Sequence, residues 1–297
     1  MKPRLRRIAI LLHERHRDAL SWPYRIWAMA RLWERWGITV EPVWGVDRPI
    51  QADLLIPHID LSYVPDEYWQ VMQEFPGPVV NRRVRDIRKR AFSTLLVKPG
   101  DGYAGPVIVK TDANNGGRSE RKILGGPEPR TALGRFLMRR QRSPSRERAS
   151  LGEATSLRRY HVFERADDVP IAVYENQALV VEQYVPERRN GQFLLHHYEF
   201  FGDYEQVRTH ASADPMVKTR TAKIEMAAGV PEVLREQRAR LGLDYAKLDY
   251  VVQNGGAHLL DISTSIGMGR EIDETLVHLS RGLAGGLSFF ERVHGRE

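Results

Sequence analysis

The chain has 297 residues, of which 42% are hydrophobic and 28% charged, a composition typical of a soluble globular protein with two or three packed lobes. It has no cysteine, which excludes disulfides, thiolate metal sites and a cysteine nucleophile, and no apolar stretch approaches the roughly 20 residues of a membrane span. The net charge of +7 favours anionic partners such as nucleotides or acidic substrates. The basic N-terminus is followed by an apolar run of only residues 8–12, so we expect no signal peptide and a cytoplasmic protein.

Residues 1–90 alternate between expected strands and helices, a pattern typical of an α/β lobe with a mostly parallel sheet. Apolar residues recur at helical spacing before Gly37, which ends the first helix. All six tryptophans lie in this lobe, and we interpret them as core residues, with a stacking site for a ligand as the alternative. The expected strands are residues 8–12, 39–44, 52–57 and 79–80, and the expected helices are residues 21–36 and 65–75.

Residues 91–185 form the expected second lobe, and residues 186–297 form the third, in which the pattern becomes antiparallel. The arginine-rich stretch 139–148 is expected to be a loop. The alternative is a docking strip for nucleic acid or an acidic protein, although no aromatic residue lies among its arginines. The expected strands are residues 105–110, 160–163, 178–185, 193–200, 206–211, 248–252 and 257–262, and the expected helices are residues 88–97, 127–142, 231–241 and 271–293.

A glycine-rich run follows the strand that ends at Lys110. Consecutive glycines and asparagines accept left-handed backbone and let N–H groups converge on an anion, and an arginine in the run adds a charge-assisted contact. The chain contains neither a P-loop nor a dinucleotide-binding G-x-G-x-x-G after a strand. A hairpin turn is the alternative interpretation. The candidate phosphate contacts are Lys110, Asn115, Gly116, Gly117, Arg118 and Ser119.

The strand that ends before Pro186 is a candidate adenine site. An exposed strand end offers N–H and C=O groups to the edge of a base, Glu182 can accept from its exocyclic amine, and Glu187 would lie near a ribose. A plain strand end with solvated glutamates is the alternative. The candidate residues are Glu182, Gln183, Tyr184, Val185 and Glu187.

The last expected hairpin carries Asp249 and Asp261. A two-residue turn at Asn254 and Gly255 would place the two carboxylates on opposite faces, whereas a three-residue loop through Gly256 would oppose them on one face. Facing carboxylates repel unless a cation lies between them, and oxygen ligands of this kind suit magnesium. We therefore expect the three-residue loop and a metal site, with one exposed and one capping aspartate as the alternative.

Four basic residues of the third lobe are candidates to hold an anionic substrate, although each alone is better explained as a solvated surface charge. They are Arg208, Lys218, Arg220 and Arg270. His196 and His197 are expected on opposite faces of a strand, so they are not a paired ligand set, and His13 and His16 are interpreted as incidental.

The order of these stretches resembles the ATP-grasp superfamily, in particular its branch of glutathione synthetase and ribosomal-protein glutamate ligase. The resemblance implies a fold in which an N-terminal α/β lobe precedes two α+β lobes that grip ATP. It also implies that Lys89 and Lys110 contact phosphates or adenine, that the glycine-rich loop closes over the phosphates, and that Asp249, Asp261 and Ser263 hold Mg²⁺. The matching stretches are residues 81–89, 107–110, 115–117, 180–185, 241–249 and 260–267.

The chain departs from the family pattern at three places, one of which is Ile266-Gly267 where the family usually has Pro-Gly. The usual Glu-x-Asn is Asp261-Ile262-Ser263, and a serine oxygen is a poorer magnesium ligand than an amide carbonyl, which places a second metal in doubt. The expected Asp and Arg of the substrate side are also replaced by the apolar residues 193–195 after Gly191. The acceptor pocket is therefore expected to differ from the one typical of that branch.

The resemblance implies an ATP- and Mg²⁺-dependent ligase that joins a carboxylate to an amine through an acyl-phosphate and forms ADP. Its substrates would be small-molecule or peptide carboxylates and amines. Such chemistry depends on charge neutralisation and positioning, and needs no protein nucleophile. The alternatives are an ATP-grasp-like kinase, a catalytically weakened nucleotide-binding protein and a basic nucleic-acid-binding module, which the stretch 139–148 favours.

Overall fold

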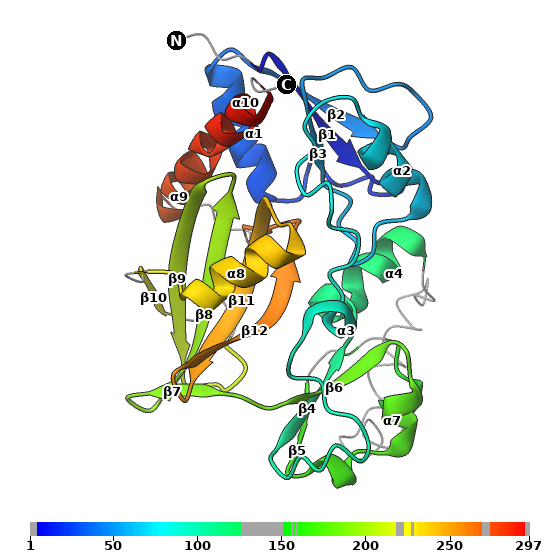
Figure 1. The fold of residues 1–297 in the computed structure, drawn as a ribbon, viewed down its shortest axis with the longest axis vertical. Coiled ribbons are helices and arrows are strands. Elements are labelled where there is room, and N and C mark those ends of the chain that lie inside the picture. Colours follow the sequence, from blue (N-terminus) through cyan, green and yellow to red (C-terminus); the bar gives the residue numbers. More distant parts are fainter. Residues whose placement is uncertain are drawn as a thin grey trace, which may run out of the picture. The chain divides into compact units, whose positions relative to one another are not determined.

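The computed structural model describes residues 5–125, 151–155, 157, 160–217, 223–226, 229–268 and 274–294 (Figure 1). The chain forms two compact units, which we call the terminal unit, Met1–Asp86 with Pro186–Glu297, and the central unit, Ile87–Val185. The expected first and third lobes share one unit, and the division at residues 90 and 185 into three lobes stays a prediction. The expected helix 127–142 and the stretch 139–148 lie outside the described residues. Among those described, no helix is long and apolar enough to cross a membrane.

The N-terminal part of the terminal unit is a parallel sheet, as its alternating pattern predicted. The strand order is β2-β1-β3, and β1 lies in the centre because its residues after Arg7 are buried on both faces. Trp33 is fully buried, whereas Trp36 is 43% exposed, so the interpretation of every tryptophan as core is wrong for Trp36. The elements are β1 Arg7–Leu12, α1 Arg25–Arg35, β2 Thr39–Trp44, β3 Leu54–Pro57 and α2 Asp66–Glu74.

An antiparallel sheet forms the second part of the terminal unit, in the order β10-β9-β8-β11-β12 with β7 paired to β8 (Figure 1). Helix α8 covers the face of this sheet that carries Tyr198 and Phe200. Its Arg238 guanidinium lies over the Phe200 ring, 3.9 Å from the ring centroid. The elements are β7 Glu187–Arg189, β8 Gln192–Phe201, β9 Tyr204–Ser212, β10 Lys223–Met226, α8 Glu232–Leu241, β11 Tyr245–Gln253 and β12 Gly256–Ser263.

One apolar core joins the two sheets of the terminal unit. Trp33 of α1 packs against Phe201 of β8 with 5.5 Å between ring centroids, and Phe201 also contacts Tyr245 and Phe290. Helices α9 Glu274–Gly285 and α10 Leu287–His294 contribute to this core. Asn81 adds a polar seam, since its side chain accepts hydrogen bonds from two backbone N–H groups at the start of β11 and donates one to Tyr245 O.

The central unit is built on a three-stranded antiparallel sheet in the order β5-β4-β6. Its apolar core includes Val107 and Val109 of β4 with Val181 of β6, all of them buried. The elements are α3 Lys89–Phe92, β4 Val107–Thr111, α4 Arg118–Leu124, β5 His161–Phe163, α7 Ile171–Glu175 and β6 Leu179–Gln183, with 3-10 turns at Asn114–Gly117, Leu151–Glu153 and Ala166–Asp168.

Three expected elements differ from the structure. The helix expected at 88–97 ends at Phe92, because the chain beyond it runs along β6 and Val97 N–H donates to Val181 O at 2.9 Å. The strand expected at 79–80 is a single bridge from Val79 to β3. The helix expected at 271–293 is interrupted at Gly286, which lies so close to the carbonyl of the β8 end that an added Cβ would fall 1.9 Å from that oxygen.

Candidate functional site

In the central unit, β4 and β6 bring together two of the predicted nucleotide contacts. Lys110 pairs with Val180 and Glu182 pairs with Ile108, so the two charged side chains lie diagonally on one face of the sheet. Lys110 Nζ lies 2.8 Å from Glu182 Oε2, and the side chains are 8% and 0% exposed. The alternative of a solvated glutamate is therefore wrong for Glu182, which is a buried carboxylate with a lysine partner.

The glycine-rich run after β4 is not a hairpin turn. It forms a 3-10 turn that leads into α4, where Arg118 and Ser119 begin the helix. Asn115, Gly116 and Gly117 have φ angles of 47, 67 and 66°, three consecutive left-handed residues that glycine and asparagine tolerate best. A Cβ on Gly116 would lie 2.8 Å from a backbone carbonyl oxygen, that of Leu157. Phosphate binding by this loop stays a prediction, and the backbone has the left-handed geometry that the prediction requires.

Lys89 lies beside the start of this loop. Its backbone N–H donates to Asp112 O at 3.1 Å, and its buried ammonium contacts Ala113 O at 3.5 Å. Lys110 lies in the last part of β4, and the two residues between β4 and the loop, Asp112 and Ala113, both contact Lys89. The expected contact of both lysines with phosphates or adenine stays a prediction.

The end of β6 is less open than the sequence predicted. Gln183 N–H donates to Leu95 O at 2.8 Å, and Tyr184 N–H donates to Pro106 O at 2.9 Å. Neither N–H is available to a base, so the expectation of an exposed strand end is wrong for these two donors. Val185 ends the central unit with 9% exposure, and the adenine site around it stays a prediction.

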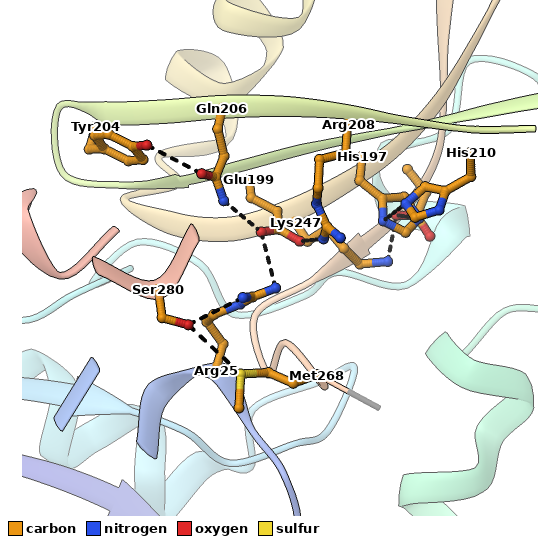
Figure 2. Close-up of polar contacts among 11 residues, drawn as sticks. Arg25, His197, Glu199, Tyr204, Gln206, Arg208, His210, Lys247, Met268 and Ser280 are labelled. Atoms are coloured by element: carbon orange, nitrogen blue, oxygen red, sulfur yellow. Dashed lines mark hydrogen bonds and ion pairs between the residues drawn. The ribbon is translucent and has the colours of Figure 1, made fainter. Parts of the chain in front are cut away.

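In the terminal unit, the antiparallel sheet carries two adjacent rows of polar side chains on the face opposite α8, several of which are drawn in Figure 2. Strand register places them side by side, because residues paired across neighbouring strands point to the same face. From β9 to β12, one row is Arg208, His197, Asp249 and Asp261, and the next is Gln206, Glu199, Lys247 and Ser263.

Asp249 and Asp261 are directly paired, as predicted, but not through the predicted loop. The turn has two residues, Asn254 and Gly255, with φ angles of 52 and 78° that fit a type I′ turn. A register shift just after Asp249 leaves Leu260 as an extra residue, and this β-bulge returns Asp261 to the face of Asp249. The expected three-residue loop is therefore wrong, whereas the opposed pairing is confirmed.

Asp249 has basic neighbours as well as its carboxylate partner. Lys247 Nζ lies 2.6 Å from Asp249 Oδ1, and His197 Nε2 lies 3.5 Å from the same oxygen. Burial raises the pKa of the Asp249 carboxyl, Lys247 lowers it and Asp261 raises it further, which leaves the pKa above its ordinary value. Burial and the charge of Lys247 hold the pKa of His197 well below its usual range, so that this imidazole is neutral at pH 7.

The donor set fits one divalent cation. Two facing carboxylates and the hydroxyl of Ser263 in the neighbouring row are oxygen ligands of the kind that magnesium takes, with water or phosphate oxygens completing its octahedron. No group of three or more histidine, cysteine or acidic side chains is arranged to hold a metal within the described part of the chain. A metal at Asp249 and Asp261 would therefore depend on ligands from outside the protein.

Glu199 is the centre of a buried ionic cluster (Figure 2). It forms ion pairs with Arg208 of β9 and with Arg25 of α1, whose guanidinium lies 3.5 Å from Glu199 Oε2, and it accepts from Gln206 Nε2 at 3.0 Å. Arg25 also donates to Ser280 of α9 at 3.2 Å. Burial raises the pKa of Glu199, but the two arginines outweigh burial and hold the pKa below its ordinary value. Arg208, a predicted substrate contact, is thus fixed by an internal carboxylate.

Glu187 is held by partners within the terminal unit. Its Oε2 accepts from Val252 N–H at 2.7 Å and lies 2.8 Å from His196 Nε2, and His196 Nδ1 lies 2.8 Å from Thr209 Oγ1. Burial raises the pKa of Glu187, but these hydrogen bonds outweigh burial and lower the pKa, which keeps the carboxylate ionised. Its contact with a ribose stays a prediction.

The remaining substrate candidates Lys218, Arg220 and Arg270 lie outside the described residues. The structure adds Lys247, Glu199 and Arg25 to the site, which the sequence reasoning missed. The alternation of polar residues in β9 and in the expected strand 193–200 was the signal that could have found Glu199, because three polar residues of β9 lie at every second position.

Solved structures with similar architecture cover nearly the whole chain. A RimK domain protein of Sphaerobacter thermophilus superposes with a TM-score of 0.50 at 15% identity, covering 96% of this chain and 99% of that one. D-alanine–D-alanine ligase of Bacillus anthracis gives 0.50 at 12% identity over 98% of both chains. The macrocyclase MdnC of Microcystis aeruginosa, bound to its precursor peptide MdnA, gives 0.51 at 11% identity over 95% and 99%.

The chain has an ATP-grasp fold. No family model matches its sequence, and no curated protein matches it either. At identities of 11 to 15%, these structures establish the α+β ATP-grasp fold.

Proposed function

We propose that this protein is an ATP-dependent ligase that activates a carboxylate as an acyl-phosphate and joins it to an amine, releasing ADP and phosphate. The observation that carries the proposal is the direct pairing of Asp249 with Asp261 on one face of β11 and β12. Two opposed carboxylates whose polar neighbours include Lys247 and Arg208 have a clear use where a polyanion and its magnesium ion are bound, since facing carboxylates repel unless cations lie beside them.

The central unit would hold the nucleotide through buried charges and a preformed loop. Lys110, oriented by Glu182, and Lys89, placed beside Ala113, supply ammonium groups for phosphate oxygens. The left-handed residues 115–117 give the loop a backbone geometry in which N–H groups can converge on an anion. These residues bind and orient the triphosphate, and they need not donate or accept a proton during transfer.

The terminal unit would hold the magnesium and the reacting carboxylate. Bound Mg²⁺, held by Asp249 and Asp261, supplies neutralisation of phosphate charge. Arg208 is fixed by Glu199 and offers a guanidinium to an anionic substrate or to the acyl-phosphate. Neutral His197, beside Asp249, adds no further positive charge at pH 7.

The substrates we propose are a small-molecule or peptide carboxylate and an amine. The fold is shared with a ligase of D-alanine and with a macrocyclase bound to a precursor peptide, so both sizes of substrate support the same proposal. The cytoplasmic location stays a prediction, and it agrees with the proposed function because an ATP-dependent ligase needs a supply of ATP.

Product analysis tests this function. The protein is incubated with ATP, Mg²⁺ and mixtures of carboxylates and amines, and ADP and new amide are measured by chromatography and mass spectrometry. Formation of ADP that requires both substrates supports the ligase. An Asp261→Asn variant should lose turnover by at least about a hundredfold, since it removes a metal carboxylate. Asp203→Asn, at a half-exposed aspartate paired with Arg292 in the same unit, is the matched control.

A kinase or a weakened nucleotide-binding protein is the second candidate, and a specific observation favours it. Ser263 stands in the row where the family usually places an amide, and Lys247 already contacts Asp249. ADP formation without a new amide would identify a kinase. A thermal shift with ATP but no turnover would identify a binding protein, because a ligand at 100 times its Kd stabilises by about 2.7 kcal/mol.

Nucleic-acid binding remains the less favoured function. Its support is the arginine-rich stretch 139–148, which lies outside the described residues. Binding to an oligonucleotide that falls steeply with salt, and that is lost when this stretch is deleted, would favour it over the ligase.

A further inference from the structure

We propose that Lys247 is a built-in cation on Asp249 that a divalent metal must displace, and that it thereby sets the metal affinity of the carboxylate pair. The inference rests on the metal site of the proposed function and adds a residue that limits it. Its basis is geometric: an ammonium lies on one oxygen of the Asp249 carboxylate, the group that would hold the metal.

Lys247 and Asp249 are neighbours on one face of β11. They lie two residues apart on the strand, and Lys247 Nζ approaches Asp249 Oδ1 to 2.6 Å, with the side chains 19% and 20% exposed. Glu199, the residue paired with Lys247 on β8, is engaged by Arg25 and Arg208. Asp249 is therefore the carboxylate that holds the Lys247 ammonium.

The charges on this face balance without a metal. Among the described residues of the cluster, Arg25, Arg208 and Lys247 are cationic, and they stand against three acids, Glu199, Asp249 and Asp261. A site that binds free divalent metal tightly carries an excess of acidic ligands, and the described residues of this face have no such excess.

An ammonium and a divalent cation that share the Asp249 carboxylate repel each other, because each would lie within about 3 Å of one of its oxygens. Lys247 can leave, since its long side chain is flexible and reaches solvent. Metal binding to the free protein thus includes the cost of breaking the Lys247–Asp249 ion pair. A bound polyphosphate would add negative charge next to the metal and so reduce this cost.

Metal titration of the nucleotide-free protein tests this inference. Mn²⁺ is titrated into the full chain and free Mn²⁺ is followed by electron paramagnetic resonance, for the wild type and for Lys247→Met and Lys247→Gln. Both variants should bind Mn²⁺ about tenfold more tightly than the wild type, the effect of losing one partly exposed ion pair that competes for the ligand. Lys98→Met, which removes an exposed lysine of the central unit, should leave the affinity unchanged.

Equal affinity of the wild type and both Lys247 variants, within twofold, would overturn the inference, as would variants that bind no Mn²⁺. Tryptophan fluorescence shows whether the variants are folded, because all six tryptophans lie in the terminal unit. If both variants unfold, a crystal of the wild type with Mn²⁺ decides. Metal on Asp249 with the Lys247 ammonium turned away supports the inference, and metal there with Lys247 still bound to Asp249 refutes it. Product analysis of the wild type tests the ligase function separately, so failure of one proposal is distinguishable from failure of the other.

Discussion

Replacing Glu199 with glutamine tests how the terminal unit fixes Arg208. The Glu199 side chain is fully buried between two arginines, and its carboxylate is the acid that neutralises both. Glutamine keeps the size of the side chain and removes the charge. Arg25 and Arg208, which are 1% and 7% exposed, would then be buried without a counter-ion.

We expect Glu199→Gln to reduce the free energy of unfolding of the terminal unit by about 3–5 kcal/mol, the usual result of breaking a buried ion pair on one side. The matched control is Glu205→Gln. Glu205 also pairs with arginines, Arg235 and Arg238, but its side chain is 27% exposed, so the loss should be about 1 kcal/mol or less.

Urea unfolding followed by tryptophan fluorescence is the appropriate assay, because all the tryptophans belong to the terminal unit and the signal therefore reports the unit that contains Glu199. A loss no larger than that of Glu205→Gln would refute the reasoning. It would mean that solvent reaches the arginines and that Glu199 does not fix Arg208.

Three further predictions concern the loop, the strand pair and pH. Gly116→Ala should raise the Kd for ATP by at least about tenfold, because its φ of 67° is strained for alanine and its Cβ would meet a backbone oxygen. Gly102→Ala, with φ of 68° and no neighbour within 4 Å, should leave the Kd unchanged, and equal effects of the two in calorimetry would contradict the account. Lys110→Met should abolish the thermal shift caused by ATP. It should also destabilise the central unit by about 3 kcal/mol, since it leaves Glu182 buried without its lysine. Retention of the wild-type affinity for ATP would exclude a contact between Lys110 and the phosphates. Burial lowers the pKa of His58 to about 3, so the unfolded chain takes up a proton near pH 6.5 that the folded chain refuses. The free energy of unfolding therefore falls, through His58, by up to about 1.4 kcal/mol per pH unit from pH 6.5 toward pH 3. Urea unfolding of His58→Phe should show a shallower fall over this range. The same dependence on pH in the wild type and the variant would contradict the prediction.

Much of the fold was predictable because its signals are local. The apolar run of β1 and the helical spacing before Gly37 specify their elements within a few residues, and the parallel sheet follows from their alternation. The helix expected at 88–97 ended early for a long-range reason, since the chain after Phe92 pairs with β6, about 90 residues away in sequence. The helix propensity of residues 88–97 carries no information about a strand partner so far away in the sequence.

The candidate site was predictable where a residue's own motif determines its neighbours. Asn254 and Gly255 are a strong signal for a two-residue hairpin turn, and the structure contains that turn. The opposed aspartates were nevertheless predicted on chemical grounds that require one extra residue in the hairpin. Both requirements are met because the extra residue, Leu260, is placed in a β-bulge rather than in the turn.

The contacts of Lys247 could not be predicted in this way, because they depend on the fold of distant segments. A lysine two residues before Asp249 is predicted to share its face, but solvent is the default environment for such a side chain. Its contact with Asp249 becomes significant because Glu199, across the strand pair, is engaged by Arg25 from a helix more than 170 residues earlier. The ionic cluster thus determines which carboxylate remains for Lys247. By the same reasoning, the charge of the metal site depends on residues outside the metal motif, and a motif alone is a poor guide to metal affinity in this fold.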